Sequence, residues 1–315
     1  MIDTIAVATS DFEIEKFNRL TRREETLPTG ETFEKQFYNS DKLNLTIDSR
    51  GFRLHFSLPK LYGLQDNFYP LGENSFETAM DSLQRNLEDI GVVADLDTMK
   101  ILRLDIFKNV ETSETFSIYS DVLRTLELKR THRRDYTDGF LTANTLRELC
   151  FYNKVRELSE SLGSLYVKQV YNFTGENIIR GELRFLRHSE VKKNGFDYLR
   201  DIPNQWNLLK VAYSDYMKQV FKYDFTGGEE MSEKVLDKVL IAKLGKEAFK
   251  YFTYKPLYEM SKQEIKELLK PHYTRKQVYN ILQEVDKKKQ RYSKVLTNVN
   301  FKSLYSELKE KFLNN

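Results

Sequence analysis

Three short segments of the chain alternate charged and apolar residues, as strands with one polar face do. Guanidinium groups match the oxygens of phosphate, and carboxylates bind hard divalent cations, so such a face suits phosphate chemistry. Any one of these strands could equally be the solvent-facing side of a half-buried sheet. The segments are ILRLDIFK, NIIRGELRFLR and FRLHFS, and their polar residues are Arg103 and Asp105; Arg180, Glu182 and Arg184; and Arg53, His55 and Ser57.

Asp105, Glu182 and His55 are the candidate metal ligands, provided that the three strands join one sheet. Carboxylate oxygens suit Mg²⁺ or Mn²⁺, and an imidazole shifts the preference toward Mn²⁺. The neighbouring arginines would then contact phosphate. The sequence therefore predicts a site for Mg²⁺ or Mn²⁺ beside a phosphate-binding surface.

A fourth segment, RELCFYNK, adds candidate nucleophiles. In an extended conformation Glu148, Cys150, Tyr152 and Lys154 share one face. A tyrosine beside a bound phosphate can attack phosphorus, but its phenol has a pKa near ~10 and needs a nearby cation or metal to activate it. Lys154 is the candidate activator. Two alternatives stay open, because Cys150 could be the nucleophile and a tyrosine in a strand often only packs.

The elements that must position these residues form an α+β pattern. Alternation around Ser49-Arg50-Gly51 predicts a hairpin over residues 43–58, and Asp138-Gly139 marks a second hairpin. Helical periodicity runs from Ser75 to Ile90 and again over residues 116–126. Strands are expected over residues 101–108 and 177–187, and another strand follows the Asp138-Gly139 hairpin and runs to about residue 154. This order predicts a mainly antiparallel sheet with helices on one face.

From about residue 202 the pattern becomes helical, which predicts a catalytic domain over residues 1–200 and a basic helical domain over 201–315. From residue 207 onward there are 22 Lys and Arg against 14 Asp and Glu, although the net charge of the whole chain is only +3. SKQEIKELLK and TRKQVYNILQEV read as two helices joined by a Pro-His-Tyr turn, with Thr274 as N-cap. A DNA-reading helix-turn-helix and an ordinary helical hairpin both fit.

Several classes of protein are disfavoured by what the sequence lacks. It has no phosphate-binding Gly-rich loop, no dinucleotide-binding Gly motif and no nucleophile elbow. A single cysteine and four scattered histidines disfavour a disulfide framework and a structural zinc site. No basic leader begins the chain and no segment approaches ~20 apolar residues, so we expect a cytoplasmic protein without a membrane.

Several of these segments together resemble the gene II replication initiator family of filamentous phages and related plasmids. The opening MIDTIAV is similar to that family's start, and SLPK, followed by Asn67, resembles its Ser-x-x-Lys element. ILRLDIF, RELCFYNKVREL and NIIRGELRF resemble its Arg-hydrophobic-Asp strand, its tyrosine segment and its Arg-x-Glu-x-Arg strand. The elements occur in family order over roughly residues 1–190.

The resemblance implies an origin-specific enzyme of rolling-circle replication that nicks and rejoins one DNA strand. Tyr152 would hold the 5′ phosphate as a phosphotyrosyl bond, leaving a 3′-OH primer for a host helicase and polymerase. Asp105 and Glu182 would bind the metal or the phosphate, whereas His55 has no counterpart in the family pattern and no His-x-His occurs. The implied phosphate or DNA contacts are Lys60, Arg103, Arg147, Lys154, Arg180 and Arg184.

Binding of the DNA backbone is also expected from the basic segment 129–134, above all from Arg133 and Arg134, and sequence preference from the C-terminal helices. The resemblance places the chain in the cytoplasm of a bacterial host. Two other functions remain open. A non-catalytic repressor of a phage or plasmid would bind DNA without forming an adduct, and a relaxase or transposase would transfer the strand to another target.

Overall fold

The structure is a computed structural model that describes residues 1–49, 51–126, 128, 130–171, 177–222, 237, 248–297 and 301–314. The chain divides into two compact units. The first contains residues 1–117, 127–222 and 310–315, and the second contains residues 118–126 and 223–309. The predicted boundary at residue 200 is therefore displaced. Helix α8 (Trp206–Val220) belongs to the first unit, because Tyr213 Oη donates a 3.0 Å hydrogen bond to the carbonyl oxygen of Gly181 in the sheet.

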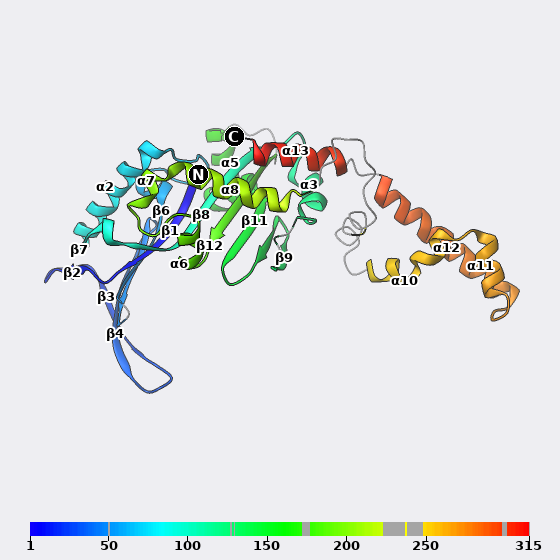
Figure 1. Ribbon diagram of the computed structural model, residues 1–315, viewed down its shortest axis with the longest axis horizontal. Helices are drawn as coiled ribbons and strands as arrows, with labels where there is room; N and C mark the ends of the chain where they lie inside the picture. The colour runs from blue at the N-terminus through cyan, green and yellow to red at the C-terminus, as the bar shows by residue number, and fades with distance from the viewer. Residues whose placement is uncertain are drawn as a thin grey trace. The chain divides into compact units, whose positions relative to one another are not determined.

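The first unit is built on a ten-stranded sheet in which every neighbouring pair is antiparallel (Figure 1). The strand order is β3-β4-β5-β6-β1-β8-β12-β11-β10-β9, and β2 (Phe12–Ile14) pairs with β7 (Val92–Ala94) in a separate small sheet. The strands of the large sheet are β1 (Ile2–Thr9), β3 (Thr21–Thr26), β4 (Thr32–Asn39), β5 (Leu43–Asp48), β6 (Gly51–Ser57), β8 (Lys100–Glu111), β9 (His132–Tyr136), β10 (Gly139–Ala143), β11 (Arg147–Asn153) and β12 (Ile178–Phe185).

The helices alternate with these strands and then dominate the C-terminal part of the chain, which confirms the predicted α+β class. Among the described residues, no helix is both long enough and apolar enough to cross a lipid bilayer. Besides α8, the α-helices within the described ranges are α1 (Leu58–Tyr62), α2 (Glu73–Asp89), α3 (Phe116–Leu123), α4 (Lys154–Leu162), α5 (Ser164–Tyr171), α6 (His188–Lys193), α7 (Asp201–Asn204), α10 (Ala248–Glu259), α11 (Lys262–Leu269), α12 (Arg275–Thr297) and α13 (Phe301–Leu313).

The two faces of the large sheet differ in chemistry, because successive side chains of a strand point to opposite sides. Leu183 and Phe185 lie on the apolar face, where the ring of Phe185 packs 5.6 Å from that of Tyr216 in α8. The other face is polar and carries Arg103 and Asp105 of β8, Glu148 of β11, and Arg180, Glu182 and Arg184 of β12. Helices α4 and α5 pack against Ile178 on this polar face, so the prediction of helices on one face only is wrong.

Most of the expected elements are present with small shifts. The hairpin β5–β6, helix α2, strand β8, helix α3, the hairpin β9–β10 and strands β11 and β12 fall where the patterns predict them. Sequence patterns do not single out β1, β3 or β4. In the central strand β1, buried and half-buried positions alternate from Thr4 to Ala8, and a bulge between Ile2 and Thr4 breaks the alternation at its start.

The second unit has a core of its own. Helices α10, α11 and α12 enclose the buried side chains of Tyr251, Tyr258, Ile265 and Val285. A capping box begins α11, because the Ser261 side chain and the Glu264 carboxylate each accept a hydrogen bond from the other residue's backbone amide. Two helices joined by a short turn, as predicted from the sequence, are therefore present.

Candidate active site

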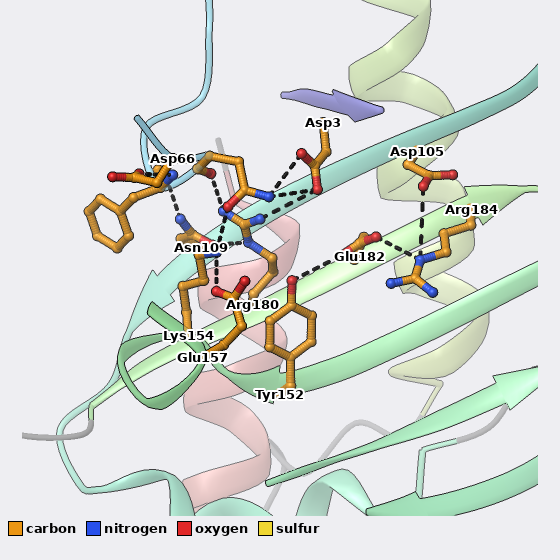
Figure 2. A network of polar contacts seen from close by, with 12 residues as sticks. Asp3, Asp66, Asp105, Asn109, Tyr152, Lys154, Glu157, Arg180, Glu182 and Arg184 are labelled. Carbon is orange, nitrogen blue, oxygen red and sulfur yellow. Dashed lines mark hydrogen bonds and ion pairs between the residues drawn. The ribbon is translucent and has the colours of Figure 1, made fainter. Parts of the chain in front are cut away.

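Tyr152 and Glu182 lie on neighbouring strands and form the centre of the polar face (Figure 2). The Tyr152 hydroxyl donates a 2.9 Å hydrogen bond to one oxygen of Glu182, and Arg184 Nε donates at 2.6 Å to the other. Arg184 also contacts Glu148 of β11 at 3.2 Å. The register explains this arrangement, because Tyr152 pairs with Arg180 and Glu148 pairs with Arg184 across β11 and β12.

Strand β8 extends this row through Asp105, which pairs with Arg184 in the register. Arg103 holds Asp105 with three charge-assisted hydrogen bonds of 2.7 to 3.1 Å, and Arg184 Nε lies 4.0 Å from the same carboxylate. Burial raises the pKa of Asp105 to about 7 despite Arg103, and the nearby Glu182 adds to the rise. The structure thus brings the two predicted carboxylates, Asp105 and Glu182, into one charged row.

A second cluster surrounds Arg180 at the end of the polar face where α4 begins. Arg180 donates to Asn109 at 2.8 Å and to the Asn67 carbonyl oxygen, and it lies 3.7 Å from Asp3. The Asn67 amide donates to both oxygens of Asp3 at 2.8 and 2.9 Å and accepts from Lys154 Nζ at 2.5 Å. The cluster is buried, and only its charge pairing makes that burial tolerable.

These contacts determine the protonation of Tyr152. Burial raises the pKa of the phenol well above its usual value, Glu182 raises it further, and Arg180 opposes both effects. Burial also favours a raised pKa for Glu182, but Arg184 and Arg180 outweigh it and lower that pKa. Glu182 is therefore ionised and accepts the hydrogen bond from the Tyr152 hydroxyl, which keeps its proton. Attack by the phenol requires this proton to move onto a base.

Tyr152 is accessible from a cavity of about 490 Å³ between the β9–β10 turn and α4. Gly139 of β10 lies directly opposite Tyr152 in the register. A Cβ atom at Gly139 would lie 2.5 Å from the Phe151 carbonyl oxygen and 2.7 Å from the Tyr152 Cβ, so no larger residue fits without displacing Tyr152.

Substitution of Gly139→Ala is therefore expected to reduce the free energy of unfolding by about 1–3 kcal/mol, because the new methyl group overpacks rigid backbone. Urea unfolding of the full chain measures the change. Gly72→Ala is the matched control, since its Cβ would meet nothing within 4 Å, and it should cost less than about 1 kcal/mol. Equal losses for both variants would contradict the steric role of Gly139.

Lys154 does not lie beside Tyr152 as expected for a continuing strand. Strand β11 ends at Asn153 and helix α4 begins at Lys154, so the alternation stops between the two residues. The ammonium group instead contacts Asn67 and Glu157. Burial lowers the pKa of Lys154, and Arg180 lowers it further. The cation with the stronger effect on Tyr152 is Arg180.

Two of the predicted DNA contacts lie away from the polar face. Arg147 belongs to the opposite face, where it donates to Tyr216 at 2.8 Å and to Glu190 at 3.4 Å. Arg133 pairs with Asp135 at 2.7 Å and lies over the ring of Phe140, whereas Arg134 alternates to the polar face. The family resemblance implied Arg147, and the basic segment 129–134 implied Arg133. Lys129 of the same basic segment lies outside the described residues.

His55 and Lys60 also lie outside the charged row. His55 is on β6, with β1 between it and β8, and lines a different cavity of about 380 Å³. Burial and Arg103 lower its pKa. Lys60 is half-buried on α1. Within the described part of the chain, no three His, Cys, Asp or Glu residues are grouped as metal ligands. Strand β1 separates His55 from Asp105.

Motifs and strand alternation in the sequence did not predict three residues of the site. Asp3 lies at the bulge of β1, Asn109 extends the polar face of β8 beyond Asp105, and Glu157 lies on α4. The alternation of β8 was a usable signal for Asn109. The bulge that aims Asp3 at Arg180 leaves no signal in the sequence.

The chain matches no protein-family model and no curated protein. Its function must therefore be inferred from the geometry of the charged row and the residues around it.

Proposed function

We propose that the chain is a DNA-nicking and strand-rejoining enzyme of rolling-circle replication with Tyr152 as its nucleophile. The observation that carries the proposal is a tyrosine that lines a cavity together with Arg184 and whose hydroxyl donates a hydrogen bond to a buried carboxylate. Packing alone does not require this arrangement, because a buried ion network gives little net stability. Nucleophilic attack on phosphorus uses a nucleophile, a proton acceptor and cations that neutralise phosphate charge, and the arrangement offers all three.

The arginines of the row divide into two roles. Arg180 is fully buried and acts on Tyr152 through the electrostatic field, whereas Arg103 and Arg184 keep 33% and 28% of their side chains exposed. The two exposed guanidinium groups are the ones that would contact the scissile phosphate. A phosphate that engages Arg184 weakens the ion pair with Glu182, which makes Glu182 a stronger base toward the proton of Tyr152.

In the proposed step the Tyr152 oxygen forms a bond to phosphorus while the bond from phosphorus to the 3′ oxygen breaks. Glu182 takes the phenol proton, and the departing 3′ oxygen takes up a proton from solvent water to become a 3′-OH. The phosphotyrosyl bond conserves the energy of the cleaved phosphodiester, so rejoining reverses the step without ATP. A host helicase and polymerase would use the 3′-OH in the bacterial cytoplasm.

Asp105 and Glu182 offer the oxygen ligands that Mg²⁺ or Mn²⁺ prefers. Burial raises the pKa of Asp105, and a bound divalent cation would favour its ionised form. When bound, the ion would neutralise charge on the transferring phosphate. The ligands that complete its coordination would include the DNA itself.

The test is a covalent-adduct assay on supercoiled DNA of the chain's own replicon with Mg²⁺ or Mn²⁺. A nicked circle with protein on its 5′ end supports the proposal. Binding without an adduct would instead indicate a repressor, and transfer of the strand to a different target would indicate a relaxase or transposase.

Sequence preference for duplex DNA is proposed to come from α12 of the second unit. Its buried face carries Val278 and Val285, and the opposite face is exposed. No acidic residue occurs from residue 268 to 283, so this surface is basic. Arg, Asn and Gln are the side chains that read base edges in a major groove. The exposed face carries Arg275, Lys276, Tyr279, Asn280 and Gln283.

Arg275→Ala and Asn280→Ala are each expected to weaken binding to origin duplex by about 1–3 kcal/mol and to relax base preference. Fluorescence anisotropy of the full-length variants measures the affinity for origin and unrelated duplexes. Lys218→Ala, which removes an exposed charge from α8, is the control. Undiminished selectivity of both α12 variants would contradict this role. Deletion of residues 205–315 is a poor test, because it removes Tyr213 and Phe312 from the first unit's core.

A further inference from the structure

Tyr136 is an exposed aromatic residue on the same cavity as Tyr152. Gly139 pairs with Tyr136 on one side and with Tyr152 on the other, so the two tyrosines occupy equivalent positions on one face. The strand between them has no side chain at this position. Tyr136 leaves 55% of its surface exposed, and both tyrosines line the cavity of about 490 Å³.

The charges around this cavity disfavour a phosphate at its α4 end. The β9–β10 turn contributes Asp138, and α4 contributes Arg156, Glu157 and Glu160. Arg156 is already paired with Asp138 at 2.6 Å and with Glu160 at 3.2 Å. Glu157 is in turn paired with Lys154, so this end holds three carboxylates against two cations and stays acidic, while Arg184 lines the cavity on its β12 side.

We propose that this cavity binds the base of a single-stranded nucleotide next to the phosphate that Tyr152 attacks, with the base stacked on Tyr136. The inference rests on the proposed function and adds the substrate contact that sets the position of the nick. Aromatic side chains stack on any base, and carboxylates accept hydrogen bonds from exocyclic amino groups. The cavity should thus favour cytosine, adenine or guanine over thymine, which has no amino group.

This arrangement separates the two parts of the nucleotide by charge. The phosphate goes to the arginine side at Tyr152, and the base goes to the acidic side under Tyr136. A base held in this way fixes which phosphate lies in line with the Tyr152 oxygen. Tyr136 is therefore a positioning residue in this proposal, and its hydroxyl is not needed.

The experiment uses the full chain in a Tyr152→Phe background, so that binding is measured without reaction. Single-stranded oligonucleotides spanning the mapped nick carry 2-aminopurine at one position each, and stacking quenches its fluorescence. One position beside the nick should be quenched. Tyr136→Ala should abolish that quenching and weaken binding about tenfold or more, whereas Tyr136→Phe should preserve both. Tyr62→Ala, a 40% exposed tyrosine outside this cavity, should change neither.

Persistent quenching in Tyr136→Ala would overturn the proposal. So would a Tyr136→Phe variant, with Tyr152 intact, that binds normally but fails to rejoin strands, since the hydroxyl would then be a second nucleophile. Adduct formation and quenching are separate readouts. A wild-type chain that quenches a mixed-sequence oligonucleotide but forms no adduct would refute the enzyme and leave the base site standing. An adduct without quenching would support the enzyme and refute the base site.

Discussion

Tyr152→Phe is expected to abolish the covalent protein–DNA adduct while the chain stays folded. Removal of the hydroxyl removes the atom that bonds to phosphorus, so the rate of adduct formation should fall by more than about a thousandfold. The fold should tolerate the change, because Glu182 keeps its 2.6 Å contact with Arg184. The loss of one hydrogen bond should cost about 1 kcal/mol in urea unfolding.

Cys150→Ala is the sharpest control for this prediction. Cys150 lies on the same face of the same strand, lines the same cavity and is the rival nucleophile. Burial raises the pKa of its thiol to about 12, so it should be unreactive and its loss should preserve the adduct. Chelation of Mg²⁺ and Mn²⁺ should reduce adduct formation by the wild type. An adduct formed by Tyr152→Phe and lost in Cys150→Ala would transfer the proposed role to the thiol.

The sequence predicted the charged row well, because its geometry follows from alternation. Arg103, Asp105, Glu182 and Arg184 share a face by strand periodicity, and antiparallel pairing of β8 with β12 then brings Asp105 next to Arg184. The sequence could not give the strand order. His55 was grouped with the two carboxylates because nothing in its segment reveals that β1 lies between β6 and β8.

Other predicted site residues lie elsewhere than the pattern implied, because the pattern changes within one or two residues. Lys154 follows Tyr152 by two positions, yet the strand ends between them and the side chain turns toward Asn67. Arg133 and Arg134 are adjacent and therefore face opposite sides of β9. The domain boundary was misplaced because the periodicity of α8 is that of any amphipathic helix. Helical periodicity does not reveal that Tyr213 packs on Gly181.

Arg180→Met is expected to reduce the free energy of unfolding by about 3–5 kcal/mol, the largest stability effect in the molecule's polar face. Arg180 is fully buried, and its guanidinium group contacts Asn109, the Asn67 carbonyl and the ring of Phe107. Methionine fills similar space but removes the guanidinium group that lies 3.7 Å from Asp3. Urea unfolding monitored by far-UV circular dichroism measures the change. Arg133 forms a partly exposed ion pair with Asp135, so Arg133→Met should reduce the free energy of unfolding by less than about 1 kcal/mol.

The double variant Arg180→Met/Asp3→Asn separates charge from packing. If the loss comes from an uncompensated carboxylate, the neutral amide of Asn at position 3 should restore a substantial part of the stability, giving a coupling energy in the double-mutant cycle. Asp3 is an informative partner because burial, followed by the charge of Glu182, raises its pKa while Arg180 lowers it. Additive losses would show that the contact with Phe107, rather than the charge, accounts for the role of Arg180. The electrostatic control of Tyr152 by Arg180 would then need another source.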